Sequence, residues 1–401
     1  MTPEIKQRIE QIRRGEVPER YVKTALGLAP ANWKRYTFGD IYTERKEPGD
    51  ENLPLLMVSI HSGVSDGEVD AAELPKQVKR IEDKSQYKKA VSGDLVFNMM
   101  RAWQGAIGTV RTTGMVSPAY IVAEPNDKAY PLFMDYYSRT PQMINQIDRQ
   151  SYGVTDFRKR LYWDSFAPIG CILPPIEEQQ KIAAILTTQD KVIELKEKRL
   201  AEKQRQKKYL MQQLLTGKKR LPGFLKSWKT VELGEIFNYI QPTAYLVKTT
   251  DYDDSYKTPV LTAGKTFILG YTNETEGVFT KVPVVIFDDF TTATKYVDFP
   301  FKVKSSAMKI LTIKDGLSIV FAYEAMQLIK FTVGGHERHW ISKYSCLTID
   351  IPDIEEQAAI AEVLSAADRE INLLRQDIEQ EKQKKKALMQ LLLTGIVRVK
   401  T

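Results

Sequence analysis

The sequence predicts an α/β (α+β) protein in which two mixed α/β domains alternate with two long helices that pair as an antiparallel coiled coil. Three observations predict it: a repeated long amphipathic segment, a shorter repeat where each domain begins, and β-rich runs in between. With 401 residues, 43% of them apolar, the chain is too long for one ordinary core and apolar enough for folded domains. We therefore expect two half-molecules related by a pseudo-two-fold internal repeat.

The longer repeat aligns Pro174–Gly217 with Pro352–Gly395 without a gap, and about 20 of the 44 aligned positions are identical. Both copies carry Ile-Glu-Glu-Gln from their third residue and end with Leu-Leu-Thr-Gly. Proline and acidic residues favour the start of a helix, and glycine favours its end. Each copy is therefore predicted to be one helix, and at 1.5 Å per residue roughly 40 residues give a length of about 60 Å.

The two helices are predicted to pair with each other rather than with themselves. Apolar residues of the second copy follow the alternating 4, 3 spacing of a coiled-coil seam, interrupted by a polar gap: Ile360, Leu364, Ala367, Ile371, Leu374, Ile378, Leu388 and Leu392. In the same frame the first copy carries Gln189, Lys196, Lys203 and Lys207. It would be a poor self-dimer, because several of these seam positions are cationic. Pairing within the chain, where Glu381 and neighbouring acids face these cations, is favoured over two independent surface helices.

The shorter repeat marks the domain starts, with Trp33-x4-Phe38-Gly39-Asp40 recurring as Trp228-x4-Leu233-Gly234-Glu235. The predicted order is an N-terminal helical segment 1–29, a domain 30–173, a helical region 174–219, a domain 220–351 and a helical region 352–401. Short β-rich runs inside the domains, such as Val282–Phe287, Met308–Ile313 and Leu317–Phe321, predict a twisted, largely antiparallel sheet. Beyond the opening motif, the two domains share little sequence.

Composition excludes several classes of protein. Cys171 and Cys346 cannot build a disulfide framework, and each is expected to be a buried thiol on an apolar strand. The segment 1–14 is polar and no 18 apolar residues run together, so we expect no secretory signal, no membrane span and a place in the cytoplasm. The net charge of +7 permits a polyanionic partner without requiring one.

Catalytic motifs are missing from the sequence. It contains neither a G-x-x-x-x-G-K-[ST] phosphate loop nor a G-x-G-x-x-G fingerprint. His336 and His339 lack a zinc-binding frame and are expected to be polar loop residues. Asp288 and Asp289 are expected in a solvated loop or at a phosphate rather than in a nuclease centre. The sequence therefore predicts a non-catalytic recognition protein with no metal or cofactor of its own.

The alternation of variable domains with helices that begin Ile-Glu-Glu-Gln and end Leu-Leu-Thr-Gly resembles the specificity subunit of type I restriction-modification systems, over essentially the whole chain. The resemblance implies that each domain is a target-recognition domain that reads one half of a split sequence in double-stranded DNA. It also implies that the coiled coil sets the spacer between the half-sites. Two modification (methyltransferase) subunits would supply S-adenosylmethionine-dependent methylation, and restriction (translocase/endonuclease) subunits would supply ATP- and Mg-dependent translocation and cleavage.

Base reading needs hydrogen-bonding groups on a scaffold and cations for phosphates, and given this resemblance the sequence offers both. Candidates in the first domain lie in strand-end loops and in a cationic loop with a glycine turn: Ser59, His61, Arg101, Trp103, Gln104, Ser117, Ser151, Tyr152, Arg158, Lys159 and Arg160. Candidates in the second domain are hydroxyls beside cations: Lys265, Thr291, Thr292, Thr294, Lys295, Lys304, Ser305 and Arg338. The helix starts are expected to cap the helices or to bind modification subunits through Glu177, Glu178, Gln179, Glu355, Glu356 and Gln357.

Two other functions stay open on the sequence alone. One is a coiled-coil scaffold that holds proteins and reads no DNA, which would show neither a steep salt dependence nor a sequence preference in DNA binding. The other is the recognition part of a single-chain methyltransferase or nuclease, which would transfer methyl groups without partners.

Overall fold

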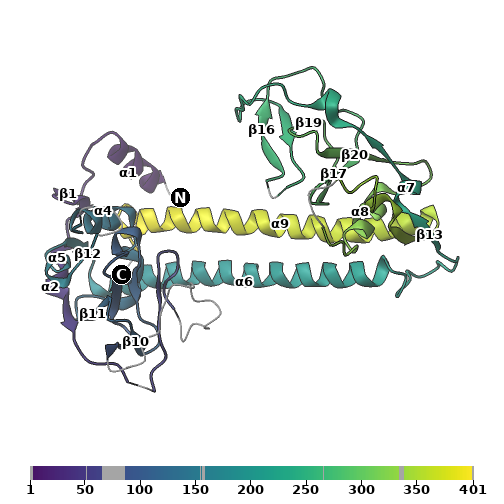
Figure 1. Ribbon diagram of the computed structural model, residues 1–401. Helices are drawn as coiled ribbons and strands as arrows, with labels where there is room; N and C mark the ends of the chain where they lie inside the picture. The colour runs from purple at the N-terminus through teal and green to yellow at the C-terminus, as the bar shows by residue number, and fades with distance from the viewer. Residues whose placement is uncertain are drawn as a thin grey trace. The chain divides into compact units, whose positions relative to one another are not determined.

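The computed structural model describes residues 3–50, 52–65, 86–153, 155, 159–264, 266–333 and 338–399 of the chain. The chain forms two compact units, unit 1 (Met1–Leu195 with Ile378–Thr401) and unit 2 (Lys196–Asp377). Each unit contains one globular domain and about half of each long helix (Figure 1).

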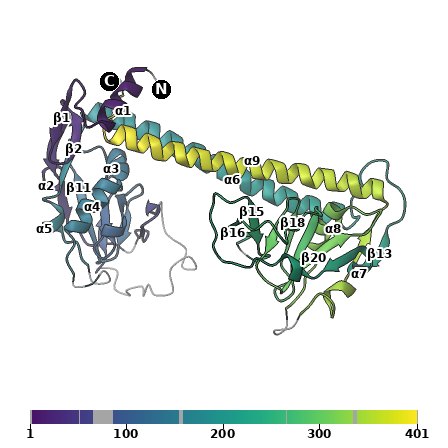
Figure 2. The same ribbon diagram turned by 90° about the horizontal axis from the view of Figure 1, so that it is seen from above.

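The two repeated segments are single helices, α6 (Ile176–Leu214) and α9 (Ile354–Leu393), of 39 and 40 residues. In each unit a part of α6 runs antiparallel to a part of α9, and the two lie side by side in both ribbon views (Figures 1 and 2). In unit 1 the Gln189 side chain donates to the Glu381 carboxylate at 2.7 Å. In unit 2 Lys196 lies 2.7 Å from the carboxylate of Asp377. The predicted antiparallel pairing is confirmed.

The seam follows the predicted frame. Most of its apolar positions are buried: Ile182, Leu186, Ile193, Ile360, Leu364, Ile371, Leu374, Ile378 and Leu392. Ala367 and Leu388 are half-buried. The cationic seam positions of α6 in unit 2 are half-buried and meet acids of α9: Lys196 pairs with Asp377, Lys203 with Glu370 and Lys207 with Asp368. Heptad spacing placed these lysines on the buried stripe, and complementary charge makes their burial tolerable.

The domain of unit 1 is built on a four-stranded antiparallel sheet with the order β4-β11-β8-β9. The helix α3 packs against β8 and β9 of this sheet, α4 packs against the 3-10 turn η2, and β3 pairs with β12 just before α6 begins. Phe38, Phe97, Phe133 and Phe166 are fully buried in its main core. The elements of unit 1 besides the long helices are α1 (Pro3–Arg13), β1 (Tyr21–Thr24), β2 (Gly27–Pro30), β3 (Lys34–Thr37), α2 (Phe38–Ile41), β4 (Tyr42–Arg45), β5 (Val58–Ser59), β6 (Gly63–Val64), β7 (Lys88–Ala90), β8 (Leu95–Asn98), the 3-10 turn η2 (Ala102–Gln104), β9 (Ile107–Thr109), β10 (Gly114–Val116), β11 (Tyr120–Pro125), α3 (Pro131–Tyr137), α4 (Pro141–Arg149), α5 (Trp163–Phe166) and β12 (Gly170–Leu173).

The domain of unit 2 repeats this plan with different residues. Its four-stranded antiparallel sheet has the order β14-β20-β17-β18, and β13 pairs with β21 just before α9 begins. Its elements are β13 (Lys229–Glu232), α7 (Leu233–Ile236), β14 (Phe237–Ile240), η4 (Pro242–Tyr245), β15 (Thr258–Leu261), β16 (Ile268–Thr272), β17 (Val284–Asp288), β18 (Thr294–Val297), β19 (Lys302–Val303), β20 (Met308–Ile313), α8 (Ile319–Met326), η5 (Tyr344–Cys346) and β21 (Thr348–Ile351). The predicted fold class and internal repeat are therefore confirmed.

Three local expectations are wrong. The segment 1–29 holds not only α1 but also the antiparallel hairpin β1–β2. The run Leu317–Phe321, predicted as a strand, begins helix α8, where the Ser318 side chain accepts the Phe321 N–H at 3.3 Å. A short apolar run cannot by itself distinguish a buried strand from a buried helix.

The third error concerns the cysteines. Cys171 is buried on β12 as expected, and burial raises the pKa of its thiol to about 12. Cys346 is exposed and lies in the 3-10 turn η5 rather than on a strand. None of the helices within the described residues is long and apolar enough to cross a membrane.

The seam generates a stability prediction on one helix. Leu364 of α9 is fully buried, whereas Leu373 on the same helix is 64% exposed. We expect Leu364→Ala to lower the free energy of unfolding by about 2–5 kcal/mol, because it leaves a cavity in the core. Leu373→Ala is the control and should change it by less than about 0.5 kcal/mol. Urea unfolding followed by circular dichroism measures both, and equal losses would contradict the seam.

Candidate nucleic-acid interface

In unit 1 the predicted recognition loops meet around Met99, the residue that follows β8. The Met99 N–H donates to the Ala119 carbonyl at 3.0 Å, and the Met99 carbonyl accepts the Leu161 N–H at 2.9 Å. These two bonds join the loop 98–105 to the Ser117 turn and to the segment that ends the cationic loop. A Cβ at Gly105, whose φ is +104°, would lie 3.4 Å from the Ile60 carbonyl, so the Ser59–His61 turn also adjoins this loop.

Several predicted side chains of unit 1 are available on these loops. His61, Arg101, Gln104 and Tyr152 are exposed. The cationic loop, residues 151–160, is closed at its base, because Tyr152 and Arg160 exchange two backbone hydrogen bonds of 2.9 and 2.7 Å. The four exposed side chains provide one guanidinium, one amide, one imidazole and one phenol on neighbouring loops.

Other predicted residues of unit 1 have internal partners. The Lys159 ammonium lies 5.0 Å from the Trp103 ring centroid and 2.8 Å from the Asp148 carboxylate. Ser59 and Ser117 accept backbone N–H groups two residues further on, as side chains that shape turns do.

Ser151 corrects the sequence prediction. It is buried and its hydroxyl donates to the Ile147 carbonyl at 2.8 Å, so it closes helix α4 rather than facing a ligand. Arg158 lies outside the described residues, as do Lys265 and His336 of unit 2.

In unit 2 the same junction forms around Asp289, the residue that follows β17. The Asp289 N–H donates to the Ala307 carbonyl and the Asp289 carbonyl accepts the His339 N–H, both at 2.9 Å. These bonds join the loop 288–293 to the loops that carry Ser305 and Arg338. A fourth loop adjoins them, because the Lys304 N–H donates to the Leu261 carbonyl at 3.1 Å. We call this arrangement, centred on Met99 in unit 1 and on Asp289 in unit 2, the loop junction.

The described candidates of unit 2 lie on these loops or on the adjoining strand β18. Thr291, Lys304 and Arg338 are exposed, and Thr292 has a left-handed backbone with φ of +57°. Lys295 is half-buried on β18. The hydroxyls of Ser305 and Thr294 already accept hydrogen bonds, from Ala307 N–H and from the Gln327 amide.

The loop junction could not be predicted from the sequence, because main-chain hydrogen bonds do not require particular residue types and so leave no sequence pattern. Exposed large side chains beside the predicted loops were also missed: Met100, Tyr162, Phe290 and Ile341. Each directly adjoins or lies close to a predicted residue, so their position in the chain was the available signal.

Two polar expectations are wrong in unit 2. Asp289 is not solvated but 1% exposed, with its carboxylate 3.3 Å from the Lys309 ammonium and accepting the Trp340 N–H at 2.9 Å. His339 is fully buried, and neither of its ring nitrogens has a hydrogen-bond partner among the described residues. Its ring lies edge-on to Phe331 at 5.3 Å. Within the described part of the chain, no group of three or more His, Cys, Asp or Glu residues is placed to hold a metal ion.

At the helix starts, the second glutamate of Ile-Glu-Glu-Gln is an internal anchor. In unit 1 the Glu178 carboxylate accepts two hydrogen bonds of 2.7 Å from Arg398, which follows α9, and one of 3.2 Å from the Trp33 indole. In unit 2 Glu356 accepts bonds of 2.6 and 2.5 Å from Arg220, which follows α6, and one of 3.2 Å from Trp228. We call each set the Glu–Arg–Trp clamp. Its carboxylate raises the pKa of Arg398 and of Arg220.

The glutamines beside these glutamates are internal too. Gln179 accepts the Tyr130 N–H at 2.8 Å, and Gln357 accepts the Ser318 N–H at 2.9 Å. Partner binding through Glu178, Gln179, Glu356 and Gln357 therefore does not fit the structure, because all four are buried and used inside the chain. Glu177 and Glu355 are exposed, and partner binding by them stays a prediction.

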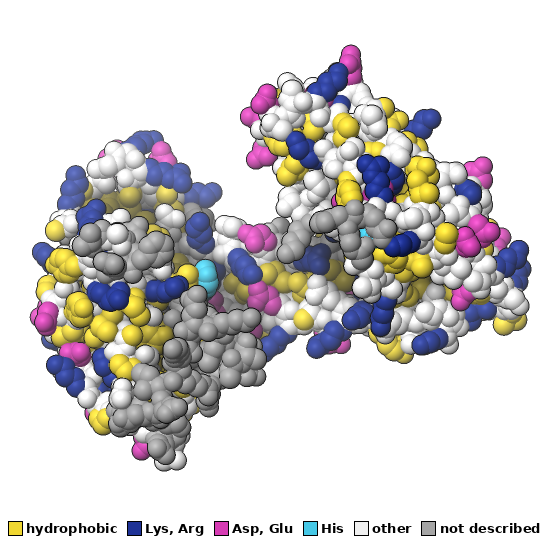
Figure 3. Space-filling model, in the orientation of Figure 1, with side chains coloured by type: hydrophobic (Ala, Val, Ile, Leu, Met, Phe, Trp, Pro, Cys, Tyr) yellow, Lys and Arg dark blue, Asp and Glu magenta, His cyan; other side chains and the backbone are white. Residues whose placement is uncertain are grey.

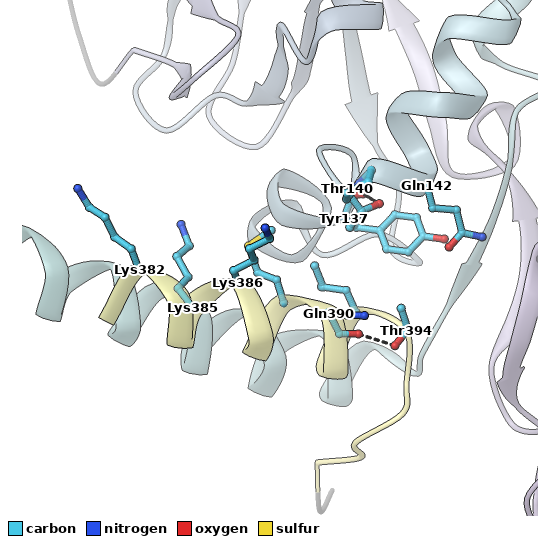
Figure 4. A pocket seen from close by; sticks show the side chains of 11 residues that line it. Tyr137, Thr140, Gln142, Lys382, Lys385, Lys386, Gln390 and Thr394 are labelled. Carbon is cyan, nitrogen blue, oxygen red and sulfur yellow. Dashed lines mark hydrogen bonds between the residues drawn. The ribbon is translucent and has the colours of Figure 1, made fainter. Parts of the chain in front are cut away.

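Unit 1 also contains a largely apolar groove of about 530 Å³ between the end of α9 and the α3–α4 corner (Figure 4). Its lining comprises Tyr137, Thr140, Pro141, Gln142, Lys382, Lys385, Lys386, Met389, Gln390, Leu393 and Thr394. The three lysines stand on the side of α9 that faces the corner. Lys385 is held by the Asp190 carboxylate at 2.5 Å, whereas Lys386 is exposed.

Charge alone does not single out a binding surface. On the face drawn in Figure 3, Lys and Arg side chains are spread over both units with Asp and Glu between them. The convergence of the loops, rather than a basic stripe, therefore marks the candidate interface.

Comparison with known proteins gives concordant matches. A family model described as "Type I restriction modification DNA specificity domain" matches residues 72–204 and again 226–383. The specificity subunit of type I restriction enzyme EcoR124I/EcoR124II from Escherichia coli is 55% identical over 140 residues, which are 33% of this chain and 34% of that protein. The putative type I restriction enzyme MjaX specificity subunit from Methanocaldococcus jannaschii is 25% identical, covering 96% of this chain and 98% of its own.

The fold has been observed before. The crystal structure of the type I restriction-modification S subunit from M. genitalium matches with a TM-score of 0.60 at 12% identity, over 92% of this chain and 97% of that one. At this identity the match concerns the fold alone.

The clamp generates a prediction in unit 1. Arg398→Ala removes two of the three side-chain hydrogen bonds that the described residues donate to the fully buried Glu178 carboxylate. We expect the free energy of unfolding to fall by about 2 kcal/mol, which is less than for a wholly buried pair because Arg398 is partly exposed. Arg14→Ala, which breaks an exposed pair with Glu10, is the control and should cost below about 0.5 kcal/mol. Thermal melts of both variants test this, and an unchanged melt for Arg398→Ala would refute the clamp.

Proposed function

The chain belongs to the family of type I restriction-modification DNA specificity domains, and from that premise we propose how it recognises DNA. Each globular domain reads one half of a bipartite target in double-stranded DNA, and the paired helices set the spacer between the halves. The two family matches fall on the two copies of the repeat, as two readers in one chain require. A scaffold that reads no DNA and a single-chain methyltransferase or nuclease are not favoured.

The observation that carries the proposal is the loop junction. In both domains one residue after a central strand ties together the loops that bear the predicted base- and phosphate-contacting residues. Direct readout needs donors and acceptors held in fixed geometry, and loops joined by main-chain hydrogen bonds provide it. The side chains on the two sets of loops differ, which suits the reading of two different half-sites.

We propose that the chain itself does no chemistry. Modification subunits would bind S-adenosylmethionine and methylate, and restriction subunits would use ATP and Mg to translocate and cleave DNA. This chain would contribute the position on the DNA at which those subunits act, in the cytoplasm, where the DNA is.

We further propose that a modification subunit docks on the unit 1 groove. Met389, Leu393 and Pro141 supply an apolar floor, and Lys386 supplies an exposed cation at its rim. An amphipathic segment with an apolar ridge and flanking carboxylates matches this chemistry.

The spacer prediction follows from helix geometry. Inserting seven residues into α6 and seven at the paired position of α9 keeps the heptad register and adds about 10 Å. We expect the spacer between methylated half-sites to lengthen by about three base pairs, with both half-site sequences unchanged. Mapping methylated adenines in cells that express the altered chain with its modification subunits measures the spacer.

The control for this experiment adds chain without lengthening a helix. Seven residues inserted after Glu16, which is exposed between α1 and β1, should leave the spacer as it was. An unchanged spacer after the double helix insertion would contradict the role of the helices in spacing.

The groove generates a prediction of its own. Lys386→Glu puts a like charge at the rim, so we expect a modification subunit to bind about tenfold more weakly or worse. Lys384→Glu changes an exposed lysine of the same helix that does not line the groove, and should alter the affinity less than about threefold. Analytical ultracentrifugation of the mixed subunits reports both, and equal affinities would place docking elsewhere.

A further inference from the structure

We propose that Asp289 is a positioning residue that holds the recognition loops of unit 2 in their reading geometry through its carboxylate as well as its backbone. The inference rests on the proposed function, since it assigns a role in reading one half-site. Asp289 touches no base in this proposal and acts through the loops that it joins.

Four contacts converge on this one residue. Its N–H and carbonyl bond Ala307 and His339, so two loops are fixed by the main chain. Its carboxylate then adds the Trp340 N–H at 2.9 Å and the Lys309 ammonium at 3.3 Å. The segment 338–342 is thereby bound twice, at consecutive residues, by the backbone and by the side chain of Asp289.

Burial makes these contacts obligatory rather than incidental. Asp289 and Lys309 are each only 1% exposed, and a charge removed from water must be paired and hydrogen-bonded. Lys309 also donates to the Gln241 side chain at 3.0 Å and lies 5.6 Å from the Tyr239 ring centroid. The carboxylate is therefore anchored to β20 and β14 beneath the loops.

Thr291, Ser305 and Arg338, which are expected to meet DNA, lie one or two residues from these bonds. The neighbouring Asp288 accepts the N–H groups of Phe290 and Thr291 at 3.0 and 2.8 Å, which folds the 288–293 loop back on itself. Arg338 directly precedes the bonded pair His339 and Trp340, and Ser305 lies two residues before Ala307. A shift of Asp289 would move all three loops together.

Unit 1 provides the contrast. Met99 makes the equivalent two main-chain bonds but has no carboxylate to add. In this proposal Asp289 takes part in no chemistry and holds the loops of unit 2 in place. Loss of the carboxylate should therefore disturb the half-site read by unit 2 and leave the other half-site unaffected.

The test measures discrimination, not affinity alone. The complex of the chain with its modification subunits is titrated with labelled duplexes that carry the mapped target, or the target with one base pair changed in either half-site. For the wild type each change should weaken binding about ten- to a hundredfold. Asp289→Ala should reduce this penalty to below about threefold in one half-site only.

Further variants separate positioning from folding. Asp289→Asn keeps an acceptor for the Trp340 N–H but leaves the buried Lys309 charge without its carboxylate partner. The double variant Asp289→Asn/Lys309→Met also removes that charge. We expect the double variant to recover discrimination to within about threefold of the wild type, even where Asp289→Ala fails to fold. Glu324→Gln is the matched control, because Glu324 is also buried and ion-paired in unit 2 but faces Lys207 of α6. It should lower the melting temperature and leave discrimination in both half-sites intact.

The outcomes are distinguishable. A wild-type complex that ignores base changes in both half-sites would overturn the proposed function, and this inference with it. This inference alone would be overturned by a wild type that discriminates together with a variant that discriminates as well as the wild type in both half-sites. The variant is Asp289→Ala, or Asp289→Asn without the Lys309→Met change. Loss of discrimination in both half-sites at once would also overturn it, because a positioning role in unit 2 is local.

Discussion

A buried carboxylate at the start of each long helix is the constraint on which the rest of the structure depends. Glu178 and Glu356 are removed from water in the first turn of a helix, where the positive end of the helix dipole favours an anion but cannot by itself replace solvation. Three donors complete the pairing, two from an arginine and one from an indole. These donors come from the segment that follows the other long helix and from the opening motif of the domain. One carboxylate thus joins three segments in each unit, which explains why Glu, Arg and Trp recur at matched places.

The seam explains how two related helices pair with each other and not with copies of themselves. A lysine on a coiled-coil seam loses hydration, and an acid opposite it recovers part of that loss. Lys196, Lys203 and Lys207 each meet an acid of α9, whereas the seam of a second copy of α6 would bring further lysines onto the same buried stripe. Specificity of pairing therefore comes from the unfavourable alternative as much as from the bonds that form. Because these lysines are only half-buried, their desolvation stays smaller than that of the clamp carboxylates.

The sequence predicted features that depend on periodicity and repetition, and failed where burial is decided by tertiary contacts. The helices, their seam and the charge pairing follow from spacing, which is a property of the chain alone. The burial of Glu178 and Gln179 does not follow from spacing, because their partners are distant in sequence. These partners are Trp33, Arg398 and Tyr130. A glutamate at a helix start serves equally well as an exposed cap, and only the fold decides. The predictions that Cys346 is buried and that His339 is a polar loop residue were wrong for the same reason, since Cys346 is exposed and His339 is buried.

The loop junction shows how one frame carries two different surfaces. The bonds made by Met99 and Asp289 use main-chain atoms, which every residue except proline possesses in full, so the side chain at this place is free to differ. The same holds for Ala119 and Ala307, whose carbonyls accept these bonds. The sheet order and the loop connections can then persist while the loop side chains change completely, as the two domains show within one chain. The freedom ends where the backbone is strained or crowded. A glycine at position 105 combines a positive φ with close approach to Ile60, so loop exchange between such domains must keep that turn together with its neighbours.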